Sequence, residues 1–173
     1  NEAPVWKLQC QGSTAVVLCP LVEENSAVGT RVGDLPLQAT DEDVGQTLTY
    51  GLTAGNTGSA FALDAATGFL SVARAVLDFE DPVTGGVYEL TVSVTDNGSP
   101  VLGATGVVRV QLVDVNERPV MRAFTRSVKE NSAVGTLVGA TFGAHASDVD
   151  AGAWGQLTFS LTGGSAHGIV GLS

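Results

Sequence analysis

The heptapeptide Glu-Asn-Ser-Ala-Val-Gly-Thr occurs twice in this chain of 173 residues, at 24–30 and again at 130–136. The second copy begins 106 residues after the first, an interval that matches the length of a small domain. An identical string at such an interval indicates an internal repeat. We therefore expect residues 1–115 to form one complete repeat and residues 116–173 to form the start of a second, truncated repeat.

Short acidic motifs flank both copies of the heptapeptide in the same order. Asn-Glu-x-Pro stands upstream, at 1–4 and 116–119, and Asp-x-Asp-x-Gly stands downstream, at 41–45 and 148–152. The carboxylates therefore keep a fixed position relative to the repeat. Such an arrangement points to a metal ion held between neighbouring repeats.

Apolar and polar residues alternate with a period of two, which predicts β-strands rather than helices. Shorter strands are expected at 48–52 and 69–72, and the turn-forming residues at 96–100 separate two longer strands. The inward faces of the longer strands are predicted to be Tyr88, Leu90, Val92 and Val94 in one and Val108, Val110 and Leu112 in the other. With 22 glycines and no helical periodicity, the chain is predicted to be an all-β sandwich.

The charge of the chain is acidic, with 18 Asp and Glu against 8 Lys and Arg and a formal net charge of −10. This balance argues against binding to a nucleic-acid backbone, which requires clustered basic residues. It favours cations or simple solubility, and most of the acids fall within the repeated motifs. No apolar run reaches the roughly 18 residues of a membrane span, so membrane attachment is expected only through regions outside this chain.

Five motifs follow one another in the first repeat. They are Glu24-Asn25, Asp41-x-Asp43, Leu77-Asp78-Phe79-Glu80, Asp96-Asn97-Gly98-Ser99-Pro100 and Asp114-Val115-Asn116-Glu117-Arg118-Pro119. In this order they resemble the cadherin extracellular repeat. The resemblance implies an immunoglobulin-like Greek-key β-sandwich in cadherin-type tandem repeats, located outside the cell or at the cell surface.

The resemblance also implies calcium as the cofactor, with up to three ions at a complete junction between repeats. Calcium takes about six to eight oxygen ligands, more than one loop of a sandwich supplies. The implied ligands at the junction are Glu24, Asp78, Glu80, Asp114, Asn116, Glu117, Asp148 and Asp150, with the backbone carbonyls of Val115 and Arg118. An upstream half-site is implied at Asn1, Asp41, Asp43 and Asp96, whose partner repeat would precede this chain.

Three residues depart from the pattern of the family. Glu117 replaces an aspartate and keeps a carboxylate that can chelate, whereas Arg118 replaces an asparagine at a position that is expected to supply a backbone carbonyl. Phe79 replaces an arginine between two of the acids. Taken singly, 41–43 would be a solvated turn, 78–80 surface charge and 96–98 an ordinary turn. An EF-hand is a poor alternative because position twelve after Asp41 is Leu52 rather than an acid.

The spacing between the motifs places a nine-residue insertion between Pro4 and Glu24. This insertion, near residues 8–20, contains the only two cysteines of the chain, Cys10 and Cys19. A disulfide between them would close a short hairpin and would suit an oxidising, extracellular setting. Two buried free thiols are the alternative. Trp6, which follows the first linker proline, is expected in the core.

The sequence contains no nucleophile elbow, phosphate-binding glycine loop or catalytic pairing of carboxylate and histidine, so we do not expect an enzyme. The leading hypothesis is a calcium-binding module of a multi-domain surface protein, in which calcium stiffens the junction for adhesion or spacing. Its partners would be neighbouring cadherin-like repeats and homophilic or heterophilic proteins. The alternatives are a structural stalk module without adhesive activity and an accessory domain of a secreted enzyme.

Overall fold

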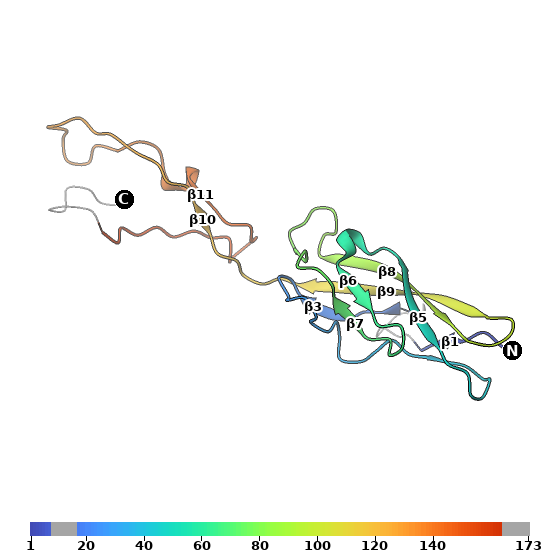
Figure 1. Cartoon of the computed structure of the whole chain (residues 1–173). Helices are drawn as coiled ribbons and strands as arrows, with labels where there is room; N and C mark the ends of the chain where they lie inside the picture. Colours follow the sequence, from blue (N-terminus) through green and yellow to red (C-terminus); the bar gives the residue numbers. More distant parts are fainter. Residues whose placement is uncertain (8–16, 164–173) are drawn as a thin grey trace. The chain divides into compact units, whose positions relative to one another are not determined.

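The computed structural model describes residues 1–7 and 17–163. Its contacts divide the chain into two compact units, Asn1–Val115 and Asn116–Ser173. The first unit is built mainly from β-strands and turns, whereas the described part of the second unit is largely irregular chain with two short strands and a 3₁₀ turn (Figure 1). Within the described residues, no helix has the length and apolar character needed to cross a membrane.

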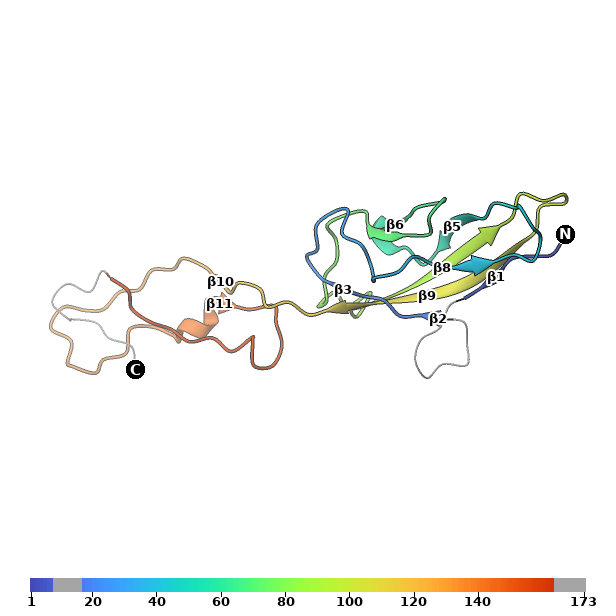
Figure 2. The same ribbon diagram turned by 90° about the horizontal axis from the view of Figure 1, so that it is seen from below.

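The larger sheet of the first unit is built on the hairpin of β8 (Val87–Thr95) and β9 (Gly103–Val113). β5 (Thr49–Ala54) pairs antiparallel with β8 at one edge of this sheet. At the other edge, β2 (Val17–Leu18) and β3 (Leu21–Glu23) pair in parallel with β9. Figure 2 shows β2 and β3 following one another along β9. This parallel pairing brings the end of β3 beside the end of β9.

The second layer consists of two short antiparallel pairs. One pair is β1 (Val5–Trp6) with β4 (Ala39–Thr40), and the other is β6 (Phe61–Leu63) with β7 (Leu70–Val72). A 3₁₀ turn at Thr57–Ser59 precedes β6. The layers enclose one apolar core, which confirms the predicted all-β sandwich.

The core faces predicted from the alternating pattern are confirmed. Tyr88 is 4% exposed and Leu112 is 2% exposed, and the other five predicted side chains are completely buried. Burying a side chain of this size contributes about 1.5–3 kcal/mol each, so these two strands carry much of the stability. Trp6, at 8% exposure, also lies in the core, as expected.

The second unit contains β10 (Val120–Met121), β11 (Ala146–Ser147) and a 3₁₀ turn at Phe142–Ala144. In each unit, the residue that follows the Asn-Glu-x-Pro motif pairs with the residue that precedes the Asp-x-Asp motif. These pairs are Val5 with Thr40 in the first unit and Val120 with Ser147 in the second.

The hydrogen bonds beside these paired strands correspond as well. Arg122 N donates to His145 O over 2.8 Å, as Lys7 N donates to Gln38 O over 2.8 Å in the first unit. The start of the second unit thus repeats the backbone pattern of the first.

Candidate metal centre

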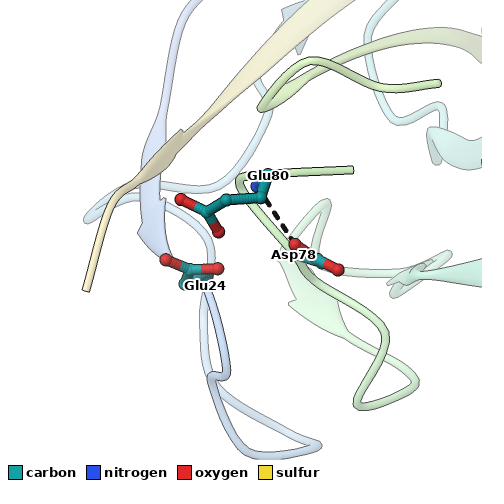
Figure 3. A group of neighbouring side chains, drawn as sticks. All are labelled: Glu24, Asp78 and Glu80. Atoms are coloured by element: carbon teal, nitrogen blue, oxygen red, sulfur yellow. Dashed lines mark hydrogen bonds between the residues drawn. The ribbon is translucent and has the colours of Figure 1, made fainter. Parts of the chain in front are cut away.

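Three carboxylates of the first unit converge at the end where β3 and β9 finish. Glu24 follows β3, and Asp78 and Glu80 lie in the loop that precedes β8. Each side chain offers an oxygen, and these oxygens all lie within 4.8 Å of one another. Figure 3 shows the carboxylates of Glu24 and Glu80 turned toward each other. The structure therefore brings together three of the predicted ligands.

Glu24 is held by backbone amides from two distant segments. Its Oε1 accepts a hydrogen bond from Val115 N at 2.9 Å, and its Oε2 accepts one from Phe79 N at 2.8 Å. The side chain is only 3% exposed. An ionised carboxylate has about four lone-pair sites, so each oxygen keeps one for a further ligand. Glu24 is thus oriented by the fold and still able to chelate.

The loop that carries Asp78 and Glu80 is fixed at both its start and its middle. Leu77 is buried, and its carbonyl accepts a hydrogen bond from Asn25 N at 3.1 Å. The Glu80 N–H then donates to Asp78 Oδ1 at 3.0 Å, which is the dashed line in Figure 3. Asp78 is exposed and Glu80 is half-buried. Both carboxylates therefore stand at the end of the unit beside Glu24.

Charge and donor type together favour a hard cation at this cluster. At an effective dielectric near 20, two carboxylates about 5 Å apart repel by roughly 3 kcal/mol. All the side-chain donors are oxygen atoms, which suit calcium, magnesium or manganese rather than zinc or copper. Three carboxylates supply part of the roughly six to eight oxygens that calcium requires. The residues present therefore fit a calcium ion whose shell is completed by further oxygens.

In the second unit, the predicted acids also form one hydrogen-bonded group. Glu117 N donates to Asp150 Oδ2 at 2.9 Å, and Asp150 N donates to Asp148 Oδ1 at 3.2 Å. Asn116 Nδ2 donates to the Glu117 carbonyl at 3.2 Å, and Arg118 is exposed. The Asp-x-Asp motif is thus folded back onto the start of its unit.

The same arrangement exists at the start of the first unit. Glu2 N donates to Asp43 Oδ2 at 2.8 Å, and Asp43 N donates to Asp41 Oδ1 at 2.9 Å. Glu2 was not among the predicted site residues, although its place in the repeated Asn-Glu-x-Pro motif, equivalent to that of Glu117, could have identified it. The two ends therefore share one geometry, and the carboxylate pair of each unit is arranged by its own backbone.

Asn1 links the other upstream residues. Its Nδ2 donates to Asp96 Oδ2 at 3.0 Å, and its Oδ1 accepts a hydrogen bond from Gln46 Nε2. The hydrogen bond from the Leu102 N–H lowers the pKa of Asp96 below its ordinary value, although burial opposes this effect. Hydrogen bonds from the Asn1 amide and the Gly98 N–H lower the pKa further. Gln46 was missed because a lone glutamine in a turn carries no sequence signal.

Cys19 is exposed and disulfide-bonded. Cys10 lies outside the described residues, so its predicted pairing with Cys19 stays a prediction.

The family model of the cadherin domain matches residues 21–113, which are more than half of the chain and most of the first unit. The chain belongs to the cadherin family. It is similar to Protocadherin Fat 4 of Mus musculus, with 33% identity over 145 residues, which are 83% of this chain and 3% of that protein. It is also 33% identical to Cadherin-23 of Mus musculus over 147 residues, which are 83% of this chain and 4% of that protein.

Solved structures extend the similarity to the fold. The crystal structure of mouse Cadherin-23 EC22-24 superposes with a TM-score of 0.65 and 32% identity, covering 94% of this chain and 49% of that chain. The Protocadherin gammaB7 EC3-6 cis-dimer structure gives a TM-score of 0.62 and 25% identity, covering 90% of this chain and 38% of that chain. This chain spans only a small part of the length of the curated relatives that it matches.

Membership of the cadherin family carries several of the expectations. Cadherin domains bind calcium, and cadherins are cell-surface adhesion proteins without enzymatic activity. The expectation of an extracellular or cell-surface location is therefore confirmed, and the expectation of no enzyme is confirmed for this cadherin chain itself.

Proposed function

We propose that this cadherin chain binds calcium at the junction between two successive repeats and that the bound ions stiffen this junction. The observation that carries the proposal is the cluster of Glu24, Asp78 and Glu80, whose oxygens lie within 4.8 Å of one another. The first repeat would add Asp114 and the carbonyl of Val115. The second would contribute Asn116, Glu117, Asp148, Asp150 and the carbonyl of Arg118, for up to three ions.

The physical basis is the balance between repulsion and shared coordination. Without a cation, each close pair of carboxylates repels by roughly 3 kcal/mol, which favours separation of the acidic segments. Bound calcium supplies positive charge and accepts oxygens from more than one segment at once. Because Glu24 is held by the amides of Phe79 and Val115, its carboxylate is in place before any ion arrives. Ion binding would therefore order the linker with little rearrangement of the first repeat.

The duplicated geometry supports the same proposal for the second repeat. The Asp148–Asp150 pair makes the same hydrogen bonds as the Asp41–Asp43 pair. Each pair would therefore bind ions shared with the repeat that precedes it. In the intact protein, the pair at Asp41 and Asp43 would receive ligands from a preceding repeat, together with Asn1 and Asp96. The partners that follow from this function are neighbouring cadherin repeats. A homophilic or heterophilic protein partner is supported by the cis-dimer of the similar Protocadherin gammaB7.

Small-angle X-ray scattering of the whole chain tests the stiffening. With calcium, we expect a scattering profile that one narrow set of conformers describes. After chelation, we expect a broader distribution of maximum dimensions, and magnesium should not restore the narrow one at the same concentration. Profiles that are identical with calcium and with chelator would refute stiffening.

A further inference from the structure

Phe79 makes two contacts that point in different directions. Its backbone N–H donates to Glu24 Oε2 at 2.8 Å, which joins the acidic loop to the end of β3. Its ring is half-buried and packs against the apolar core. The aromatic side chain between Asp78 and Glu80 thus gives this acidic turn an apolar anchor. The residue therefore connects the carboxylates to the core.

The ring of Phe79 packs against the backbone of Gly86. A Cβ atom added at Gly86 would fall 2.8 Å from Phe79 Cδ2, so the ring lies directly against the glycine backbone. The Gly86 carbonyl accepts a hydrogen bond from Leu112 N at 2.7 Å, close to the end of β9. Gly86 also has a φ of +71°, which favours glycine. The ring thus rests on the segment that is bonded to β9 two residues before Asp114.

We propose that Phe79 is a positioning residue that holds Asp78 and Glu80 within reach of Glu24 in the absence of metal. This inference rests on the proposed calcium site and deepens it. The repulsion between the three carboxylates tends to push the loop away from Glu24, and the packed ring opposes that movement. A loop ordered in advance loses less conformational entropy when the ion binds, and the affinity rises accordingly. Phe79 itself is not a ligand.

Calcium titration of the whole chain tests this role with Phe79→Ala and Phe79→Leu. Outer-shell changes at metal sites typically weaken binding about 10–100-fold, and we expect a loss of roughly tenfold for Phe79→Ala. Phe79→Leu should recover most of the affinity, since leucine restores an apolar anchor. Leu48→Ala is the matched control, because Leu48 is also half-buried against the core but precedes β5 at the opposite end of the unit. It should lower the melting temperature of the metal-free chain without weakening calcium binding.

Two adjacent glycines provide a test that leaves the ring intact. Gly85 has a φ of +55° and open space around a Cβ, whereas a Cβ at Gly86 meets the Phe79 ring. Both alanine variants carry the strain of a left-handed backbone. Only the Cβ of Gly86→Ala also displaces the Phe79 ring, so Gly86→Ala should weaken calcium binding several-fold more than Gly85→Ala. In a Phe79→Ala background, this difference should disappear.

The outcomes separate the two proposals. If the unmodified chain takes up no calcium, the proposed function fails. If it takes up calcium and Phe79→Ala binds with unchanged affinity, the positioning role is overturned. If Phe79→Ala does not fold, the comparison of Gly86→Ala with Gly85→Ala decides, and equal affinities overturn the role.

Discussion

Replacement of Glu24 by glutamine is expected to weaken calcium binding by at least about 100-fold, because it removes a charged ligand rather than an outer-shell support. It should also destabilise the metal-free chain. The Glu24 carboxylate accepts two backbone N–H groups in a buried position, whereas a glutamine amide presents an NH₂ group to one of them. A buried donor left without an acceptor costs about 1–3 kcal/mol. Calorimetric titration and thermal unfolding of the same samples measure both effects.

Glu89→Gln is the matched control for this experiment. Glu89 lies on the outward face of β8, and its carboxylate pairs with Arg109 Nε at 3.9 Å. The same change of charge there removes an exposed ion pair worth about 0–1 kcal/mol, so both affinity and stability should stay close to those of the parent chain. Equal calcium affinities for Glu24→Gln and the parent chain would contradict the assignment of Glu24 as a ligand.

Replacement of Gly55 by alanine is expected to destabilise the first unit by about 3 kcal/mol or more, through backbone strain and overpacking together. Gly55 directly follows β5 and has a φ of +79°. A Cβ there would overlap the carbonyl oxygen of Glu89, so β5 and β8 would have to separate. Urea unfolding monitored by circular dichroism measures the change in the free energy of unfolding.

Gly29→Ala separates the two contributions to this loss. Gly29 has a φ of +91°, yet no atom lies within 4 Å of the position of its Cβ. Its substitution should cost only the left-handed backbone strain of roughly 1–2 kcal/mol. Equal losses for the two variants would show that β5 and β8 do not approach as closely as described.

Sequence reasoning succeeded best where a local pattern determines the structure. The alternation in β8 and β9 requires one buried face, and the predicted residues are buried. It was less complete at the start of β9, because the predicted inward face began only at Val108 whereas the strand begins at Gly103. Residues 103–106 are small, so they carry no alternating signal, and their pairing with β8 determines their strand conformation. The parallel pairing of β3 with β9 likewise depends on contacts distant in sequence.

In the candidate site too, what the sequence motifs indicate differs from what depends on contacts distant in sequence. The resemblance to the cadherin repeat implied that Glu24, Asp78 and Glu80 belong together, and the structure brings these residues together. The burial of Glu24 depends on Val115, 91 residues away, which no local pattern reveals. The contribution of Phe79 depends on the absence of a side chain at Gly86, a distant feature of packing. The complete ligand set at the junction stays a prediction.

Calorimetric titration of the whole chain with calcium decides whether the carboxylates around Glu24 form a metal centre. We predict saturable uptake with a Kd on the order of 10⁻⁴–10⁻³ M, the range of extracellular calcium modules, and loss of this binding in Glu24→Gln. An absence of calcium uptake across that range would contradict the claim that these carboxylates form a metal centre.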